Sequence, residues 1–261
     1  MLANYHTHTV RCKHASGTER EYIEQAIQRG FLELGFSDHV PQPYPEWFTS
    51  GIRMDMSELE DYTSTLYRLK EEYKKDIKIL VGYEVEYSRR FFPTLLDKLR
   101  EYPYDYMIMG QHYVPNEVEG FNTGSKTPDE ERLLEYVDLV IEGMKTGHFA
   151  YLAHPDLMYF SGPDEIYQKH MKKLVQASID MDFPLEVNFA GFVWQRHYPS
   201  DRFFSLASSM GAKFIIGCDA HDPDFIRHPE ELDAFEDFLN RNNIVYGDNL
   251  LNIDRETGEQ Q

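Results

Sequence analysis

Histidine and carboxylate side chains that could hold metal ions recur along the whole of this 261-residue sequence. Seven of the eleven histidines fall in short, separate motifs: His6, His8, His14, His39, His112, His154 and His221. Carboxylates such as Glu84 and Asp219 accompany them. Neutral imidazole and carboxylate oxygen are ligands that zinc, manganese and iron accept in hydrolytic sites. A single His-x-His would be a weak signal, but its repetition predicts a site for divalent metal ions.

The spacing within two motifs also predicts where the side chains point. Residues two apart on a strand face the same way, so His6 should share a face with His8, and Asp219 with His221. We expect both faces to line one cavity. The histidines without such a pattern are expected to be exposed or to cap helices: His148, His170 and His228.

The motifs must be positioned by regular elements, and the sequence predicts alternating strands and helices. Strands are expected at residues 2–6, 32–37, 77–85, 104–110, 150–154, 185–188 and 213–217. Helices are expected at residues 18–29, 57–74, 128–145, 163–181 and 229–240, with Pro128 at a first helical position and Ser200 as a further cap. The segment 114–125 is expected to be a loop. Because strand ends converge on one face of a parallel barrel, seven such units predict a closed or nearly closed barrel with its site there.

Composition limits the classes of partner. A formal net charge of −19 would repel a polyanion, so we expect a small substrate and no nucleic acid. No apolar run is long enough to span a bilayer and the first residues carry no leader pattern, which predicts a cytoplasmic protein without membrane contact. Cys12 and Cys218 are too few for a disulfide framework and are interpreted as packing residues.

Taken in order, the motifs resemble those of the PHP superfamily, named for polymerases and histidinol phosphatases. They are His6-Thr7-His8 with Cys12-Lys13-His14, Ser37-Asp38-His39, Gly82-Tyr83-Glu84, Gln111-His112, His154-Pro155-Asp156 and Asp219-Ala220-His221. The resemblance covers essentially the whole chain and is closest to the histidinol-phosphate phosphatase branch. It implies a single PHP-type metal-dependent hydrolase domain over residues 1–261. The implied α/β fold is a distorted, TIM-like (βα)7 barrel with the metal site at the carboxyl ends of the strands.

The resemblance also implies two or three divalent ions, of zinc, manganese or iron, and assigns their ligands. One ion would take His6, His8, Glu84 and Asp219. Glu84 would bridge to a second ion held by His112 and His154. A third ion would take His14, His39 and His221. A metal-bridging hydroxide held by Glu84, with His154, Asp219 and His221 at the centre, would attack phosphorus in line.

Several neighbouring carboxylates allow two interpretations. By spacing alone Glu86 is as good a metal ligand as Glu84, and only the resemblance favours Glu84. Asp38 and Asp156 adjoin ligand histidines, so they either orient imidazole rings or act as ordinary turn or helix caps.

A phosphate ester also needs cationic side chains, and the best-placed candidates for substrate binding are Arg196 and its neighbour His197. A solvated loop charge is an equally good interpretation of Arg196. It is the better interpretation of three other cations: Arg11, Lys13 and Arg53.

The resemblance implies a phosphomonoesterase that hydrolyses L-histidinol phosphate to L-histidinol and phosphate in histidine biosynthesis. Other small phosphate esters or nucleotides, or an amide bond as in amidohydrolases, remain alternative substrates for the same metal chemistry. A non-catalytic metal-binding module is the least favoured reading because the ligand set is intact. The sequence does not indicate an oligomeric state.

Overall fold

Parallel strands pair in an order that follows the sequence. The computed structural model describes residues 1–226, 231–246 and 251. One sheet has the order β1 (Ala3–Asn4), β2 (Glu33–His39), β3 (Lys78–Val85) and β4 (Tyr106–Met109), and a separate parallel pair is formed by β7 (Leu185–Asn188) and β8 (Phe214–Gly217). Isolated bridges join Met109 to Leu152, Leu152 to Leu185, and Thr7 to Ala220. The strands therefore form a curled parallel sheet of half-barrel shape.

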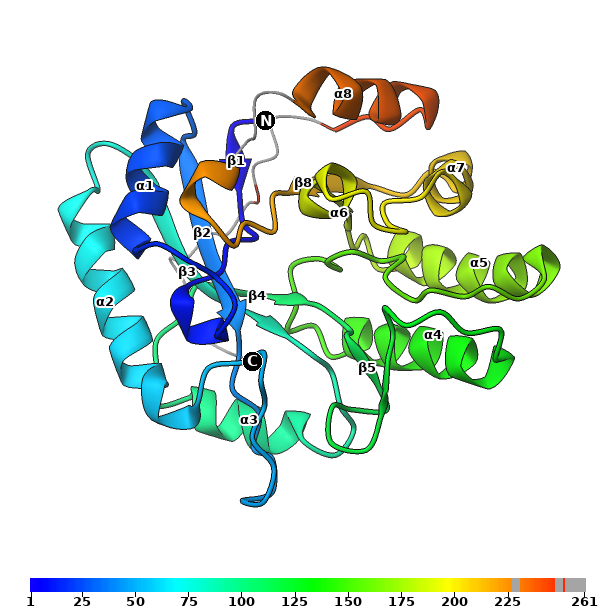
Figure 1. The fold of residues 1–261 in the computed structure, drawn as a ribbon, viewed down its shortest axis with the longest axis horizontal. Helices are drawn as coiled ribbons and strands as arrows, with labels where there is room; N and C mark the ends of the chain where they lie inside the picture. Colours follow the sequence, from blue (N-terminus) through cyan, green and yellow to red (C-terminus); the bar gives the residue numbers. More distant parts are fainter. Residues whose placement is uncertain (227–230, 247–250, 252–261) are drawn as a thin grey trace.

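The helices lie outside this sheet, with α1 and α2 on one side and α4 and α5 on the other (Figure 1). They are α1 (Glu19–Gln28), α2 (Leu59–Glu72), α3 (Phe92–Leu99), α4 (Glu130–Lys145), α5 (Asp164–Asp180), α6 (Phe189–Val193), α7 (Asp201–Met210) and α8 (Leu232–Arg241). Short 3-10 turns span Val10–Cys12, Met56–Glu58 and Pro223–Phe225. None of the helices in the described part of the chain combines the length and apolarity that a bilayer crossing requires.

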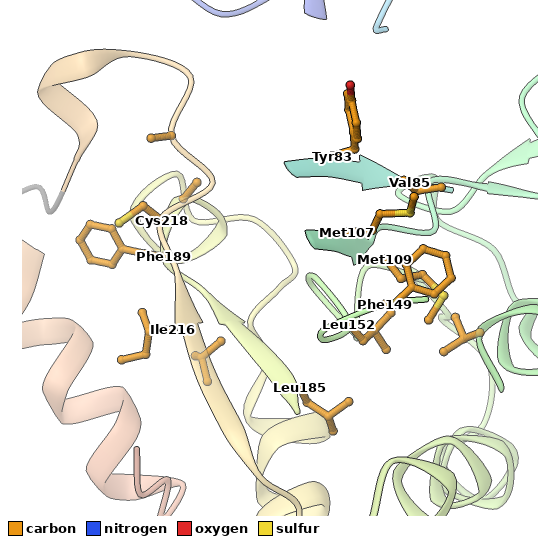
Figure 2. Packing of buried hydrophobic residues seen from close by; sticks show 14 of the residues in the cluster. Tyr83, Val85, Met107, Met109, Phe149, Leu152, Leu185, Phe189, Ile216 and Cys218 are labelled. Carbon is orange, nitrogen blue, oxygen red and sulfur yellow. The ribbon is translucent and has the colours of Figure 1, made fainter. Parts of the chain in front are cut away.

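Alternation along the strands divides the buried residues into two groups. In β4, Met107 and Met109 belong to the large core beneath the helices, whereas Tyr106 and Ile108 belong to a small core on the opposite face. Figure 2 shows Met107 and Met109 gathered with Phe149 on the helix side. The same period of two sends the even-numbered residues of β3 to the inner face. Glu84 therefore lies on that inner face, near the carboxyl end of β3.

The strand expected at residues 150–154 is reduced to the bridge residue Leu152. Its backbone is paired on both sides, because Ala153 N donates to Met109 O (2.8 Å) and Leu152 N donates to Pro184 O (3.0 Å). The chain then turns at His154, whose φ is 31°. The segment therefore pairs with its neighbours on both sides at Leu152, but it turns away at His154 before a regular ladder can form. The strand predicted at 185–188 is confirmed as β7.

Other expectations need correction. The segment 114–125, expected to be a loop, contributes to an antiparallel hairpin of β5 (Tyr113–Val114) and β6 (Phe121–Asn122). Pro128 precedes its helix: Asp129 is the N-cap of α4, and its side chain accepts from Glu131 N. Ser200 caps α7 as expected. The start of the helix expected at 229–240 lies partly outside the described residues, and α8 begins at Leu232.

The prediction that His170 is exposed or caps a helix is wrong. Its side chain is 2% exposed within α5, and its Nε2 lies 2.8 Å from Glu130 Oε1 at the start of α4. The ring therefore joins two packed helices, which an isolated histidine in a helical sequence does not reveal. His148 is exposed as expected, and His228 lies outside the described residues.

Candidate metal centre

Glu84 is the centre of a cluster that contains the side chains predicted as metal ligands. Its Oε1 lies 2.9 Å from His154 Nε2 and 3.4 Å from His112 Nε2. Its Oε2 lies 2.8 Å from His39 Nδ1, because the β2–β3 register places His39 directly beside Glu84. Glu84 is only 1% exposed, so one buried carboxylate faces three imidazoles from three different segments.

Asp219 forms a second meeting point deep in the cluster. Its Oδ1 lies 3.0 Å from His8 Nε2 and 3.3 Å from His6 Nε2. His6 and His8 do share a face, as expected, although the regular strand β1 ends at Asn4. Asn4 Oδ1 accepts from both Cys218 N (2.8 Å) and His6 N (3.2 Å), which ties the end of β1 to the segment after β8. An isolated bridge from Thr7 to Ala220 adds a backbone connection between the same two segments.

A third group, called the rim trio below, combines the buried His39 with the exposed His14 and the partly exposed His221. One nitrogen each of His14, His39 and His221 can be chosen so that all three lie within 4.8 Å of one another. The His8 and His221 rings stack at 4.1 Å, which connects this rim trio to the deeper group. The structure thus brings together all of the residues predicted from the motifs: His6, His8, His14, His39, Glu84, His112, His154, Asp219 and His221.

The orientation of four imidazoles is fixed by protein oxygens on the side away from the cluster. Nδ1 lies against such an oxygen in His6 (Glu186, 2.7 Å), His8 (Asp38, 3.4 Å), His14 (Cys12 carbonyl, 2.7 Å) and His221 (Asp219 carbonyl, 3.0 Å). Fixing the tautomer in this way leaves Nε2 as the lone-pair atom, which is the usual arrangement around a bound metal. Asp38 therefore contacts an imidazole, whereas Asp156 accepts from the backbone N–H of Ser200 (2.7 Å), the N-cap residue of α7.

Several atoms of the cluster are buried without a well-aligned hydrogen bond among the described residues, although two of them lie close to an oppositely charged group: His6 Nε2, His8 Nε2, Glu84 Oε2, His154 Nδ1 and His221 Nε2. Leaving one buried polar atom unpaired costs about 1–3 kcal/mol, so a cluster of them indicates a place where a ligand completes the bonding. Imidazole and carboxylate donors suit divalent transition ions. The residues present fit a divalent metal site.

Two glycines make room for the buried carboxylates. A Cβ at Gly110 would collide with Glu84 Oε1, and a Cβ at Gly217 would collide with Glu186 Oε1. Side chains larger than hydrogen at these positions would push both acids out of place. The backbone also takes unusual conformations at the site, since His154 and Asp219 have φ values of 31° and 52°. Such left-handed geometry in non-glycine residues is costly and concentrates at functional sites.

The mutual charges of the cluster set its protonation. Burial alone would raise the pKa of Glu84, but the surrounding imidazoles of His112, His39 and His6 and the hydrogen bond with His154 outweigh it and hold that pKa well below its usual range. Burial lowers the pKa of His39 and His112 well below the usual value, so these rings stay neutral. For His6, His8 and His154, burial lowers the pKa, but nearby carboxylates outweigh it and raise the pKa above the usual value, so an ion bound to these rings would displace their protons.

Two buried residues that organise the site went unrecognised in the sequence. Glu186, which belongs to none of the motifs, accepts from His154 N (3.0 Å) and contacts His6 Nδ1 (2.7 Å). Arg53, expected to be a solvated loop charge, is 1% exposed and pairs with Glu86 (3.0 Å). Nothing in the sequence around Arg53 indicates that its side chain is buried. Glu86 therefore pairs with Arg53, whereas Glu84 faces the imidazoles, so the two carboxylates have different roles.

The other two cations interpreted as solvated loop charges differ from Arg53. Lys13 is exposed and lies 3.0 Å from Asp55, whereas Arg11 is partly buried and pairs with Asp61 at 2.6 Å. Both cysteines are buried, as expected. Cys12 Sγ also lies within 4.8 Å of nitrogens of His8 and His221, but burial raises the pKa of this thiol and keeps it protonated, which makes it a poor ligand.

A cavity of about 530 Å³ opens onto the cluster, and both expected substrate-binding residues line it. Arg196 is exposed, lies 5.7 Å above the Trp194 ring and has no ion-pair partner in the part of the chain that is described. His197 Nε2 donates to Leu157 O (2.7 Å), and its ring stacks on Tyr159 at 4.1 Å. The cavity thus joins the metal-type cluster to an unpaired guanidinium and an aromatic wall.

A curled parallel α/β sheet that carries a buried histidine–carboxylate cluster at its strand ends defines a class of metal-binding folds used in hydrolysis. The chain belongs to the PHP domain family, whose model matches residues 4–190. The family resemblance seen in the sequence motifs is thereby confirmed.

Individual relatives agree with this assignment. A probable histidinol-phosphatase of Deinococcus radiodurans is 29% identical over 235 residues, which cover 85% of this chain and 87% of the relative. A probable histidinol-phosphatase of Schizosaccharomyces pombe is 27% identical over 250 residues, covering 85% of this chain and 81% of the relative. In fold, the chain is similar to a histidinol phosphate phosphatase from Lactococcus lactis in complex with zinc, L-histidinol and phosphate. The TM-score is 0.71 at 18% identity, over 94% of each chain.

Proposed function

We propose that this protein is a metal-dependent phosphoric monoester hydrolase that converts L-histidinol phosphate to L-histidinol and phosphate in histidine biosynthesis. The observation that carries the proposal is the convergence of imidazoles on Glu84 and Asp219 beside a cavity that also contains Arg196. The names of the relatives that match most of the chain's length favour this substrate over other phosphate esters.

The proposed ligand scheme has two or three divalent ions, of zinc, manganese or iron. His6, His8 and Asp219 would hold one ion together with Glu84, and the distances around Asp219 support this group. His112 and His154 would hold a second ion that shares Glu84. A third would be held by the rim residues His14, His39 and His221, which the compactness of that trio supports.

Bound divalent ions would lower the pKa of a water molecule and stabilise the negative charge that develops on a phosphoryl group. Glu84, His154, Asp219 and His221 form the centre of the reaction site in this scheme. Arg196 can bind phosphate oxygens through two parallel N–H donors. His197, whose Nε2 donates to Leu157 O, lines the same cavity and would be a further substrate contact.

We also propose that the curled sheet closes into one distorted (βα)7 barrel and that the chain forms a single domain over residues 1–261. The bridges of Leu152 to strands on both sides, and of Thr7 to Ala220, support closure. Residues from both ends of the sequence meet in one cluster, which supports a single domain. A cytoplasmic location stays a prediction.

The test is phosphate release from L-histidinol phosphate beside glucose 6-phosphate, AMP and p-nitrophenyl phosphate, with metal content measured on the same sample. We expect kcat/KM for L-histidinol phosphate to exceed the others by orders of magnitude and to vanish after chelation. Equal, slow cleavage of every ester would leave a general phosphoesterase and refute the substrate. A metal-loaded sample that cleaves none of them would refute the activity.

A further inference from the structure

Arg53 is buried between carboxylates that come from two different segments. Its Nη2 lies 3.0 Å from Glu86 Oε2, at the end of β3, and its Nε lies 2.8 Å from Glu117 Oε2, in the β5–β6 hairpin. The side chain is 1% exposed. Burying a guanidinium is costly unless it is well paired, so this placement indicates a specific task rather than a chance surface contact.

The Glu86 carboxylate connects Arg53 to the metal-type cluster. While Oε2 faces Arg53, Oε1 accepts hydrogen bonds from the backbone N–H groups of His112 and Tyr113, both at 2.7 Å. The His112 backbone is therefore fixed from behind, and its imidazole Nε2 faces Glu84 at 3.4 Å. Any shift of Glu86 would move His112 relative to Glu84.

The chain segment that precedes Arg53 bonds to the same two residues, Glu86 and Glu117. Glu117 accepts from Ser50 Oγ at 2.7 Å, and Gln42 Nε2 donates to the Glu86 carbonyl at 3.0 Å. Met54 N donates weakly to His39 O at 3.4 Å, next to the cluster. Arg53 directly follows Ile52, which lines the cavity beside the cluster.

We propose that Arg53 is a positioning residue, which sets the affinity of the ion site containing His112 by holding Glu86 against the His112 backbone. The inference rests on the proposed function only in taking His112 as a ligand. With Arg53 intact, both Glu86 oxygens are bonded and His112 has one fixed position. Without it, the buried Glu86 charge is uncompensated and rearranges, which releases the backbone N–H groups of His112 and Tyr113.

The test titrates metal-free protein with Mn²⁺ by calorimetry, with no substrate present. Arg53→Met, Glu86→Gln and the double variant are compared with wild type, and His112→Ala identifies which binding step depends on His112. We expect each single variant to weaken that one step about 10- to 100-fold and to leave the remaining ions in place. The double variant should lose no more Mn²⁺ affinity than the single variant with the larger loss, because both changes break one connection.

A matched control separates positioning from general damage. Lys70 Nζ pairs with Asp105 Oδ2 at 2.8 Å, and that oxygen also accepts from Val81 N, at the opposite end of the strands. Lys70→Met should leave all Mn²⁺ affinities unchanged. If Arg53→Met fails to fold, Glu86→Gln and the double variant, which remove the unbalanced charge, decide the question.

Unchanged Mn²⁺ affinity in folded Glu86→Gln protein would overturn the proposal, and so would losses that simply add in the double variant. An equal loss in Lys70→Met would overturn it as well, since the effect would then be general destabilisation. Because binding is measured without substrate, inactivity toward L-histidinol phosphate would refute the proposed function and leave this result standing.

Discussion

His6 Nδ1 and Glu186 Oε1 lie 2.7 Å apart, although they are 180 residues apart in sequence and both are fully buried. The carboxylate also accepts from His154 N through its other oxygen. Glu186 therefore orients two candidate metal ligands from behind the cluster without facing the cavity itself.

Replacing Glu186 with Gln tests this relationship. We expect divalent metal affinity to fall about 10- to 100-fold, because the amide holds the His6 tautomer and the His154 backbone less firmly. Metal content after dialysis against limiting Mn²⁺ would measure the loss. Replacing the exposed Glu60 with Gln serves as a control. Full metal retention in Glu186→Gln would contradict the expectation.

Metal binding should also depend on pH. Burial lowers the pKa of His8, but hydrogen bonds and charge from Asp219 and Asp38 outweigh it and raise that pKa to about 9 in the metal-free protein. An ion must displace this proton, so affinity should rise with pH, by about tenfold per unit for each proton released. Mn²⁺ calorimetry at pH 6, 7 and 8 in buffers of different ionisation enthalpy would count the protons. A flat profile would show that His8 is already neutral.

The stability of the metal-free protein should depend on pH because of Asp156. Burial raises the pKa of this acid from 3.8 to about 6. The unfolded chain loses the proton near pH 4 and the folded chain near pH 6, so ionisation destabilises the fold as pH rises between these values. The full penalty, about 2–3 kcal/mol, is present above pH 6.

Asp156→Asn removes this penalty and keeps an oxygen for Ser200 N. Relative to wild type, the variant should gain stability between pH 4 and pH 7 in urea unfolding experiments. The protein must be metal-free, because cations beside His154 would lower the Asp156 pKa again. A stability difference that does not vary with pH would contradict the assignment.

Arg196→Met tests the substrate side of the cavity. Losing a bidentate phosphate contact should reduce kcat/KM about 10- to 100-fold, since charge-assisted hydrogen bonds contribute roughly 1.5–3 kcal/mol. Metal content should stay at the wild-type level, because the guanidinium is not part of the cluster. Arg241→Met, on an exposed ion pair with Asp201, is the control. If kcat/KM of Arg196→Met equals that of wild type, Arg196 does not bind the substrate phosphate and is a solvated loop charge.

The sequence was most informative where a short local pattern determines the outcome. Alternation and capping located most strands and helices, and the motif order identified the residues around Glu84. It could not reveal that residues 150–154 form only a bridge, because that depends on how closely two neighbouring strands approach. Arg53 and Glu186 were missed for a related reason. Their roles arise from burial against distant partners, and a charged residue in a loop or strand looks the same whether it is solvated or enclosed.

Asn4 accepts a hydrogen bond from the backbone of Cys218, 214 residues later in the chain, and His6 and Asp219 meet just beyond this contact. A growing polypeptide on the ribosome therefore carries seven of the nine proposed ligands before Asp219 and His221 have been added. We expect the ion site that combines His6 and His8 with Asp219 to form only after β8 has been synthesised and has paired. Fragments that end before β8 would then bind an ion weakly at that site, however well the earlier strands had paired.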